Sequence, residues 1–542
     1  MAEVYVTLSE AAELEGVQYQ TMARRTQRNK KNFVTKTEKS ETGGRDVVLV
    51  AVSSLSKQAR NAWKEGGKGI MFGDVNVKVE DGNLGRSSST GTGTSIKIGI
   101  SNVESKSPIL ISGTMNAKKI KEKVGNTPLA DACIDAVEWG ASSIYCIPVK
   151  AGTAGTIGKI TEDKKGYGTF EVKGSPNNAY DIVVEVMDAG ECNEGSFRYS
   201  LDGGNTFTEE MTIPITGEAE LATTGLTAKF TDAEGGDSFM EGDRFTFSTT
   251  SPAMSNESVI SAVESLINSP LMFEFVHIVG VSSKALWASL CTIANDFLTK
   301  YKRPLFFVCE ARGKKADESL EDYVNAMLEE RKGINNIYMQ VVCSNSRYQR
   351  MDGRVQDINN AGIVTGLYGR AKESQSIGEV KSFPISEAKL LKLLPEGIED
   401  YIETLDKAKY VTIRQYIGKE DYYVTSANMM SPEGSDYSYA EDVRVSNRLV
   451  KAVRAKALDE LQVEVDPEDI ETSITNIQEQ LNTPVEDAVR DKIISSGSVT
   501  IDTENLNILV DEKLDINITY VPMGHVREMN LTFAVENPYS AS

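Results

Sequence analysis

The sequence predicts a multidomain α+β protein whose α/β layered core carries an inserted β-sandwich domain. Three observations lead to this fold class. Apolar strand-like runs alternate with helix-length periodic segments over residues 96–150 and again over 253–409, which is typical of a layered α/β sheet. Between these halves, residues 151–252 hold only short strand patterns and turns. Extended strand patterns also lie on either side of the core.

Residues 1–66 form the first predicted domain, a winged helix-turn-helix-like unit. A strand at Val4–Val6 is followed by a helix with Ser9 as its N-cap, because serine at this position accepts a hydrogen bond from the first helical turn. A second helix at about Gln18–Arg28 and a hairpin over Thr35–Val52 complete the pattern. It resembles the small winged domain at the N-terminus of Mu-type transposases.

Residues 67–95 are predicted to be a linker and an N-terminal arm. Polar and apolar residues alternate here, so that Val75, Val77 and Val79 share one face of a strand. The following stretch Gly85–Ser95 is rich in Gly, Ser and Thr but lacks the Gly-Lys-[Ser/Thr] of a phosphate-binding loop. It is therefore interpreted as a flexible linker.

The α/β domain is predicted over 96–150 and 253–409. Helices are expected at Val259–Asn268, Lys284–Tyr301 and Leu320–Lys332. His277 lies in an apolar strand-like run, where we expect a hydrogen-bonded core histidine rather than a ligand or a base.

The insertion 151–252 has the pattern of a β-sandwich. Short strands at Val183–Val186, Phe197–Leu201 and Phe245–Phe247 are separated by glycine-rich turns. The two ends of an insertion must lie close together, so we expect this domain to stand off the α/β core.

The last two predicted parts are a C-terminal core domain, 410–526, and a C-terminal arm, 527–542. Leu514–Val521 alternates apolar and polar residues, Pro522-Met523-Gly524 breaks the pattern, and Arg527–Val535 alternates again. Upstream lie Tyr410–Tyr423 and Ser435-Asp436-Tyr437, followed by an arginine-bearing helix. In order and spacing this ensemble resembles the C-terminal core of contractile tail sheath proteins, and the resemblance covers about residues 70–542.

The resemblance implies a structural protein that polymerises as a helical stack of rings, with sixfold symmetry, around an inner tail tube. Baseplate and tail terminator proteins would be further partners, and contraction would drive the tube through a target cell envelope. The implied location is a virion tail sheath assembled in the bacterial cytoplasm. In sheath proteins, strand arms reach neighbouring subunits and complete their sheets. Carried over to this chain, the arms are Val75, Val77, Val79, Met529, Leu531, Phe533 and Val535, and the receiving sheet includes Ile516, Ile518 and Tyr520.

A basic stripe is a further candidate surface. Residues 444, 448, 451 and 454 are spaced so that they line one face of a helix, and all are basic: Arg444, Arg448, Lys451 and Arg454. By analogy this stripe would face the tube. The alternative is a solvated helix face, neutralised by acidic residues that follow it.

Catalytic chemistry is not indicated. The chain has two histidines and six widely spaced cysteines, without HExxH, CxxC or GxSxG motifs. We therefore expect no enzyme, no metal site and no cofactor. No run of about 18 apolar residues suggests a membrane span, so a soluble protein is expected.

Two other functions compete with the sheath interpretation. Residues 1–66 carry a net charge of +3 in a chain of net charge −21, and Arg24, Arg25 and Arg28 cluster on the second helix. These residues favour a DNA-binding regulator or transposition protein, although an acidic chain binds phosphates poorly. We expect this domain to be a reused decorating module that binds DNA at most weakly. The third alternative is a tail or surface protein that binds glycans through the β-sandwich.

Overall fold

The computed structural model describes residues 4–28, 32–38, 47–57, 59–60, 93–105, 107–502, 506 and 508–535. The chain divides into two compact units, Met1–Glu80 and Asp81–Ser542. Its mixed α+β class with several sheets agrees with the predicted fold class. In the described part of the chain, no helix combines the length and the apolarity needed to cross a membrane.

The first unit packs two short helices against a three-stranded antiparallel sheet of order β1-β3-β2. Its elements are β1 Tyr5–Thr7, α1 Leu8–Leu14, α2 Tyr19–Arg28, β2 Thr35–Glu38, β3 Val47–Ala51 and the 3-10 turn η1 Val52–Ser54. The predicted N-cap Ser9 is wrong, because α1 already begins at Leu8. Thr7 and Glu10 cap the helix instead. The Glu10 amide donates to Thr7 Oγ1 at 3.3 Å, and the Thr7 amide donates back to Glu10 Oε2 at 2.8 Å.

A six-stranded sheet of order β17-β16-β15-β4-β6-β5 forms the centre of the second unit. All neighbouring strands are parallel except β5, which is antiparallel to β6. The strands are β4 Thr94–Ile100, β5 Ile109–Ser112, β6 Ser143–Val149, β15 Phe275–Val281, β16 Phe306–Glu310 and β17 Met339–Val342. Every residue of β4 is buried, as expected for a parallel strand covered on both faces.

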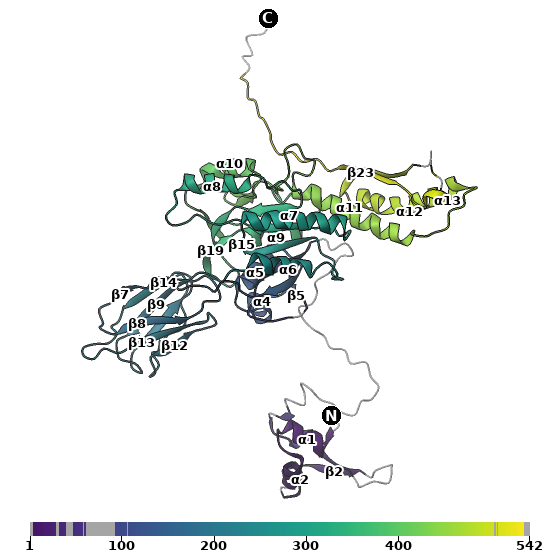
Figure 1. Cartoon of the computed structure of the whole chain (residues 1–542). Coiled ribbons are helices and arrows are strands. Elements are labelled where there is room, and N and C mark those ends of the chain that lie inside the picture. The colour runs from purple at the N-terminus through teal and green to yellow at the C-terminus, as the bar shows by residue number, and fades with distance from the viewer. Residues whose placement is uncertain are drawn as a thin grey trace. The chain divides into compact units, whose positions relative to one another are not determined.

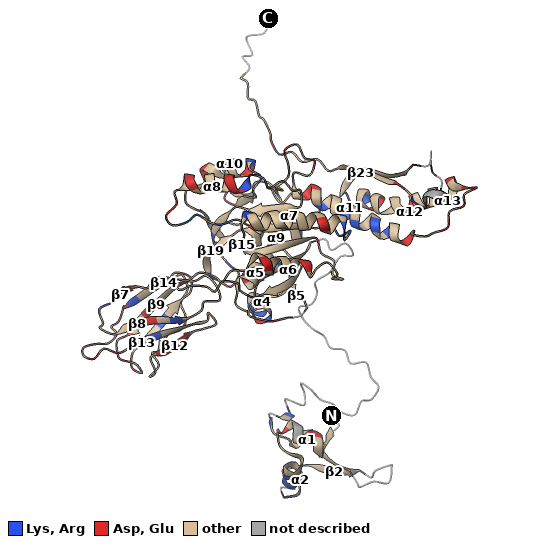
Figure 2. Cartoon of the chain, viewed as in Figure 1, with Lys and Arg blue, Asp and Glu red and all other residues tan. Residues whose placement is uncertain are grey.

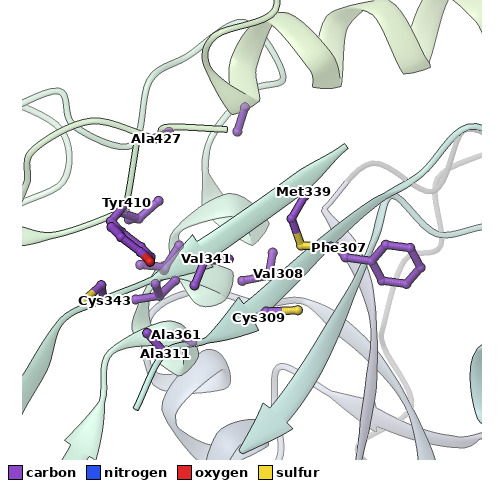
Figure 3. Close-up of a cluster of buried hydrophobic side chains, with 14 of the residues drawn as sticks. Phe307, Val308, Cys309, Ala311, Met339, Val341, Cys343, Ala361, Tyr410 and Ala427 are labelled. Carbon is purple, nitrogen blue, oxygen red and sulfur yellow. The ribbon is translucent and has the colours of Figure 1, made fainter. Parts of the chain in front are cut away.

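Helices cover the central sheet (Figure 1). They are α4 Ala117–Val124, α5 Pro128–Glu138, α6 Asn256–Glu264, α7 Lys284–Thr299, α8 Leu320–Arg331 and α9 Ala361–Arg370. The 3-10 turn η2 Ile398–Tyr401 and α10 Ile402–Lys407 follow, and α10 packs beside α8. Figure 3 shows part of the core of the second unit, in which Val341 of β17 lies close to Tyr410, while Phe307 of β16 points away from Tyr410. The ends of α7 and α8 lie within two residues of the ends predicted for the helices at 284–301 and 320–332.

His277 is a buried core residue, as predicted. Its Nδ1 lies 2.7 Å from Lys97 Nζ and its Nε2 lies 2.9 Å from Glu310 Oε1. Burial lowers the pKa of His277 to about 4, and the neighbouring Lys97 adds to this effect. Both ring nitrogens are thus satisfied inside the sheet, and the residue contributes to the packing of β15.

Helix α9 packs unusually close to α5 through its glycines. A Cβ on Gly366 would lie 2.6 Å from the Ala136 carbonyl oxygen, and one on Gly362 would lie 2.7 Å from Asp135 Cβ. Such distances require glycine, which explains two helix-weakening residues inside a buried helix.

The insertion consists of two antiparallel sheets that share one apolar core. The larger has the order β11-β10-β9-β14-β7 and the smaller has the order β12-β13-β8. Their bounds are β7 Thr161–Asp163, β8 Thr169–Gly174, β9 Asp181–Asp188, β10 Ser196–Ser200, β11 Met211–Thr212, β12 Glu218–Leu221, β13 Leu226–Thr231 and β14 Arg244–Ser248. Phe170 stacks on Phe245 across the two sheets, with ring centroids 4.3 Å apart.

The two ends of the insertion are hydrogen-bonded to each other. The amides of Gly152 and Thr153 both donate to the Ala253 carbonyl, at 2.9 and 3.1 Å. Further in, Asn178 Nδ2 donates to Asp131 Oδ2 of α5 at 2.6 Å. Although burial alone would raise the pKa of Asp131, Arg350 and Arg354 hold it well below its usual range. The insertion therefore joins the core through its paired ends, through a buried, charged contact and through further hydrogen bonds, such as that from Asn126 Nδ2 to the Thr223 carbonyl at 3.3 Å.

Candidate assembly site at the last strand

The C-terminal lobe is built from two long helices and a two-stranded antiparallel sheet. The lobe's elements are α11 Ala440–Asp459, α12 Ile470–Arg490, β23 Ile494–Ile501, α13 Ile508–Asp511 and β24 Ile516–Pro522. Five small strands precede them in the chain: β18 Asn345–Gln349, β19 Val355–Asn359, β20 Leu390–Leu394, β21 Ile413–Gln415 and β22 Tyr422–Val424. Apolar residues at helical spacing, including Leu449 of α11 and Leu481 of α12, form its core. Gly497 lets β23 approach α12, since a Cβ there would lie 2.7 Å from Val485 Cγ1.

One edge of this sheet is occupied by side chains of α12. Gln478 Nε2 donates to the Val499 carbonyl at 2.9 Å, and the Val499 amide donates to Asn482 Oδ1 at 3.3 Å. Both backbone groups of Val499 therefore point away from β24, which makes Val499 and its opposite residue Ile518 a non-hydrogen-bonded pair. The outer edge of β23 is in this way partly closed.

The outer edge of β24 is open. Ile516 and Tyr520 lie two residues to either side of Ile518, so all three form non-hydrogen-bonded pairs with residues of β23. Their backbone N–H and C=O groups therefore point away from β23. No hydrogen bond reaches these outward groups from any residue that the structure describes. A row of unpaired groups of this kind is a template for another strand.

The helix-facing side of β24 is apolar and incompletely covered. Ile516 and Tyr520 are half-buried against the C-terminal lobe core, and burial raises the pKa of Tyr520. Ile518 between them is 38% exposed. A further strand beside β24 would cover this gap if it carried apolar residues at every second position.

The segment beyond β24 has that pattern. Met529, Leu531, Phe533 and Val535 occupy alternate positions and are 76, 78, 91 and 100% exposed. They belong to no strand in the structure, and Figure 1 shows the segment leaving the body alone. Four apolar side chains of this size facing water make up an exposed apolar surface of the kind that marks interaction sites.

The root of this segment is fixed to the body by side chains. Arg527 Nη2 donates to Glu441 Oε1 at 2.6 Å, and the guanidinium carbon lies 3.3 Å from the centre of the Tyr439 ring. His525 Nε2 donates to the Ser374 carbonyl at 3.0 Å. We name the contacts of His525 and Arg527 with Ser374, Tyr439 and Glu441 the root clamp. No sequence pattern predicts the root clamp, since only the arginine at the start of the last alternation hints at it.

The structure corrects the predicted basic stripe at its first residue. Arg444 is fully buried and forms an ion pair with Glu274. Its guanidinium also donates to the carbonyls of Tyr368, at 3.1 Å, and Lys372, at 3.2 Å. The helical spacing is correct, but this face of α11 packs against the α/β core rather than against solvent.

The remaining three residues of the stripe differ in exposure. Arg448 donates to Glu373 Oε1 at 3.1 Å and to Asp491 Oδ2 at 3.0 Å. Lys451 Nζ donates to the Phe273 carbonyl at 2.7 Å, and burial lowers its pKa to about 8. Arg454 alone among the four is exposed. Figure 2 shows that basic and acidic residues are mixed along α11 and α12.

The predicted N-terminal arm, with Val75, Val77 and Val79, lies outside the described residues. A cavity of about 600 Å³ lies at the carboxyl ends of β15 and β16, where ligands of open α/β sheets bind. Two of its charged groups, Arg350 and Asp135, pair with each other at 2.8 and 2.9 Å. In the described part of the chain, no group of His, Cys, Asp and Glu is arranged to hold a metal.

Comparison with known families gives two matches. The model described as DUF2586, N-terminal domain, matches residues 72–428, and that described as DUF2586, C-terminal domain, matches residues 436–540. A comparison with curated proteins gives no match.

Several solved structures are similar to the chain. A sheath tail protein from Desulfitobacterium hafniense has 12% identity and a TM-score of 0.44, covering 83% of this chain and 100% of its own. A sheath tail protein from Listeria innocua has 13% identity and a TM-score of 0.43, covering 81% and 97%. A chain of the anti-feeding prophage baseplate in its contracted state has 10% identity and a TM-score of 0.46, covering 86% and 98%.

Proposed function

The chain belongs to the DUF2586 family, and we propose that it is a structural subunit of a contractile tail sheath. In this proposal, copies polymerise by donating the C-terminal segment, residues 528–535, to the open edge of β24 in another copy. The main support for this proposal is that the open edge of β24 and residues 528–535 are complementary. The edge offers unpaired backbone groups over an uncovered apolar face, and the segment offers apolar side chains at alternate positions.

The pairing has a clear physical advantage. On addition to β24, Met529, Leu531, Phe533 and Val535 would lie on the same side as Ile516, Ile518 and Tyr520, above the helices of the lobe. Glu528, Asn530 and Thr532 would then face water on the opposite side. Both the hydrogen-bonding groups and the apolar surface are satisfied in one step, because side chains alternate across a strand.

The wider sheath mechanism follows from the sequence resemblance. Stacked rings, with sixfold symmetry, would surround an inner tail tube, and baseplate and terminator proteins would close the two ends. The N-terminal arm at Val75–Val79 would supply a second strand to neighbouring copies. Strand links of this kind tolerate rotation of subunits, since the hydrogen bonds run within each sheet while the linkers bend. The role is structural and non-catalytic, and its place is the tail of a particle assembled in the bacterial cytoplasm.

The experiment that tests this function is removal of residues 528–542. The truncated chain keeps the root clamp and β24, so it should fold as the full chain does, with an unchanged circular dichroism spectrum. It should elute as a monomer where the full chain forms tubes of regular diameter in electron micrographs. Tubes of normal length from the truncated chain would rule out the proposed strand donation.

For the first unit we propose a decorating or spacing role. One observation favours DNA binding as a second candidate, since Arg24, Arg25 and Arg28 are exposed along α2. A fragment of residues 1–66 should bind duplex DNA no more tightly than nonspecific binders do at physiological salt, with a Kd of about 10⁻⁴–10⁻⁶ M. Sequence-selective nanomolar binding would favour the DNA-binding function instead.

A further inference from the structure

The C-terminal segment has a competing partner within its own chain. Only Met523–Arg527 separates β24 from the alternating residues, and hairpin loops commonly contain about two to five residues. A hairpin closed here would place Glu528–Val535 on the outer edge of the same β24. Pairing within one chain has a large effective-concentration advantage over pairing between chains. Such a subunit would hide its own arm and close its own edge at once.

The structure shows the segment held away from that hairpin. After Pro522 the chain turns toward α11, where Arg527 lies between the Tyr439 ring and the Glu441 carboxylate. Glu441 is 2% exposed, and its Oε2 has no hydrogen-bond partner within the described chain. Arg527 is thus the group that satisfies a buried carboxylate. His525 adds a second attachment two residues earlier, on the Ser374 carbonyl.

We propose that the root clamp is a latch that prevents the arm from pairing with its own β24. Arg527 acts as a positioning residue: it directs residues 528–535 outward and leaves both arm and edge free for other copies. That the free arm serves polymerisation rests on the proposed function. Whether the arm is free or paired with its own β24 is a property of a single chain and can be measured without polymerisation.

Hydrogen exchange on the unpolymerised full-length chain tests the latch. Two variants release it: Arg527→Gln, and the double variant Arg527→Gln/Glu441→Gln, which avoids leaving a buried charge unpaired. Arg454→Gln is the matched control, because this arginine is exposed on the same helix as Glu441. Peptides covering residues 528–535 and 516–522 report on arm and edge, and circular dichroism checks that each variant is folded.

In the wild type and the Arg454→Gln control, the arm amides should exchange at the rate of an unstructured chain. In both latch variants, arm and edge amides should exchange about tenfold or more slowly, as protected strands do. The protection should not change on dilution, because it arises within one chain, and these variants should form fewer and shorter polymers.

Arm amides that remain unprotected in folded latch variants would overturn the proposal, whatever happens to polymerisation. So would protection that disappears on dilution, since this would report pairing between copies. If the wild type never polymerises, the proposed function fails, while the exchange rates still decide whether Arg527 keeps the arm free.

Discussion

At the scale of single residues, Arg444 connects the C-terminal lobe with the α/β core. It links α11 to Glu274, just before β15, and to three carbonyls at and after the end of α9. Glu274 Oε2 also accepts a hydrogen bond from the Gly93 amide, at 2.8 Å. Loss of the arginine would leave the buried Glu274 carboxylate without its ion-pair partner, which lowers the free energy of unfolding.

Replacement of Arg444 by Met should therefore destabilise the chain strongly. Removing one member of a buried ion pair costs about 3–5 kcal/mol. The double variant Arg444→Met/Glu274→Gln should recover part of this loss, since no unpaired charge remains. Urea unfolding followed by circular dichroism measures both. The control Arg454→Met should stay within about 0.5 kcal/mol of the wild type, and a similar small effect of Arg444→Met would contradict the burial of this pair.

Asp442, next to Glu441 of the root clamp, makes the stability of the chain depend on pH. Burial, followed by repulsion from Glu441, raises the pKa of Asp442 to about 6. The unfolded chain has the lower, ordinary value near 4. Ionisation therefore favours the unfolded state, and stability falls as pH rises from about 4 to about 6.

Asp442→Asn removes this effect. It should raise the free energy of unfolding at pH 7.5 by about 1 kcal/mol, after allowance for solvent screening of a partly exposed group. The gain should vanish at pH 4, where Asp442 is protonated in the wild type. Thermal melts at the two pH values decide this, and a gain that is equal at both would assign the effect to something other than ionisation.

At the scale of elements, strand positions could be read from the sequence, but their partners could not. The alternation over Leu514–Val521 located β24, which spans Ile516–Pro522. The final alternation, Arg527–Val535, forms no strand in the single chain, because a strand also needs an edge to pair with. The spacing of Arg444 to Arg454 correctly predicted one helix face. The partner Glu274 lies 170 residues away from Arg444, and no local pattern shows that Arg444 is buried.

Two proline substitutions in β24 separate its open edge from its paired edge. Ile518→Pro removes an amide that points outward, so the β23–β24 ladder should survive while strand addition is blocked. Thr519→Pro removes an amide that is bonded to Ser498, and it should cost at least about 1 kcal/mol of stability. Circular dichroism and electron microscopy should show a folded, non-polymerising chain for Ile518→Pro. Normal tubes from that variant would mean that the edge is not the acceptor.

At the scale of the whole molecule, the chain combines a rigid core with parts that the sequence marks by changes of composition. The loss of helix-length periodicity after residue 150 indicated the insertion, and the strand at Val183–Val186 lies within β9. The contact of Asn178 with Asp131 was not predictable, because its two sides are distant in sequence. Nor was the close packing of α9 on α5, which depends on the absence of side chains at Gly362 and Gly366.

Excision of residues 151–252, with Lys150 joined to Ala253, should leave a folded and polymerising core. The ends of the insertion are already hydrogen-bonded neighbours. Asp131 loses Asn178 but keeps Arg350 and Arg354. Asn126 and Val355 lose their hydrogen bonds to Thr223 and Asp202 as well, so the cost should be about 2–4 kcal/mol. Size-exclusion chromatography and electron microscopy check the outcome. An aggregated or unfolded product would show that the insertion is part of the folding core.

In the proposed assembly, the edge of β24 receives residues 528–535 from another copy. The most direct measurement is a cryo-electron microscopy map of the assembled chain, at a resolution that separates strands about 4.8 Å apart. We predict a further strand beside β24 whose density connects to the root clamp of a neighbouring copy, with Leu531 and Phe533 on the side of α12. A bare β24 edge in the assembled state, or a strand there that connects to its own Arg527, would contradict strand donation between copies.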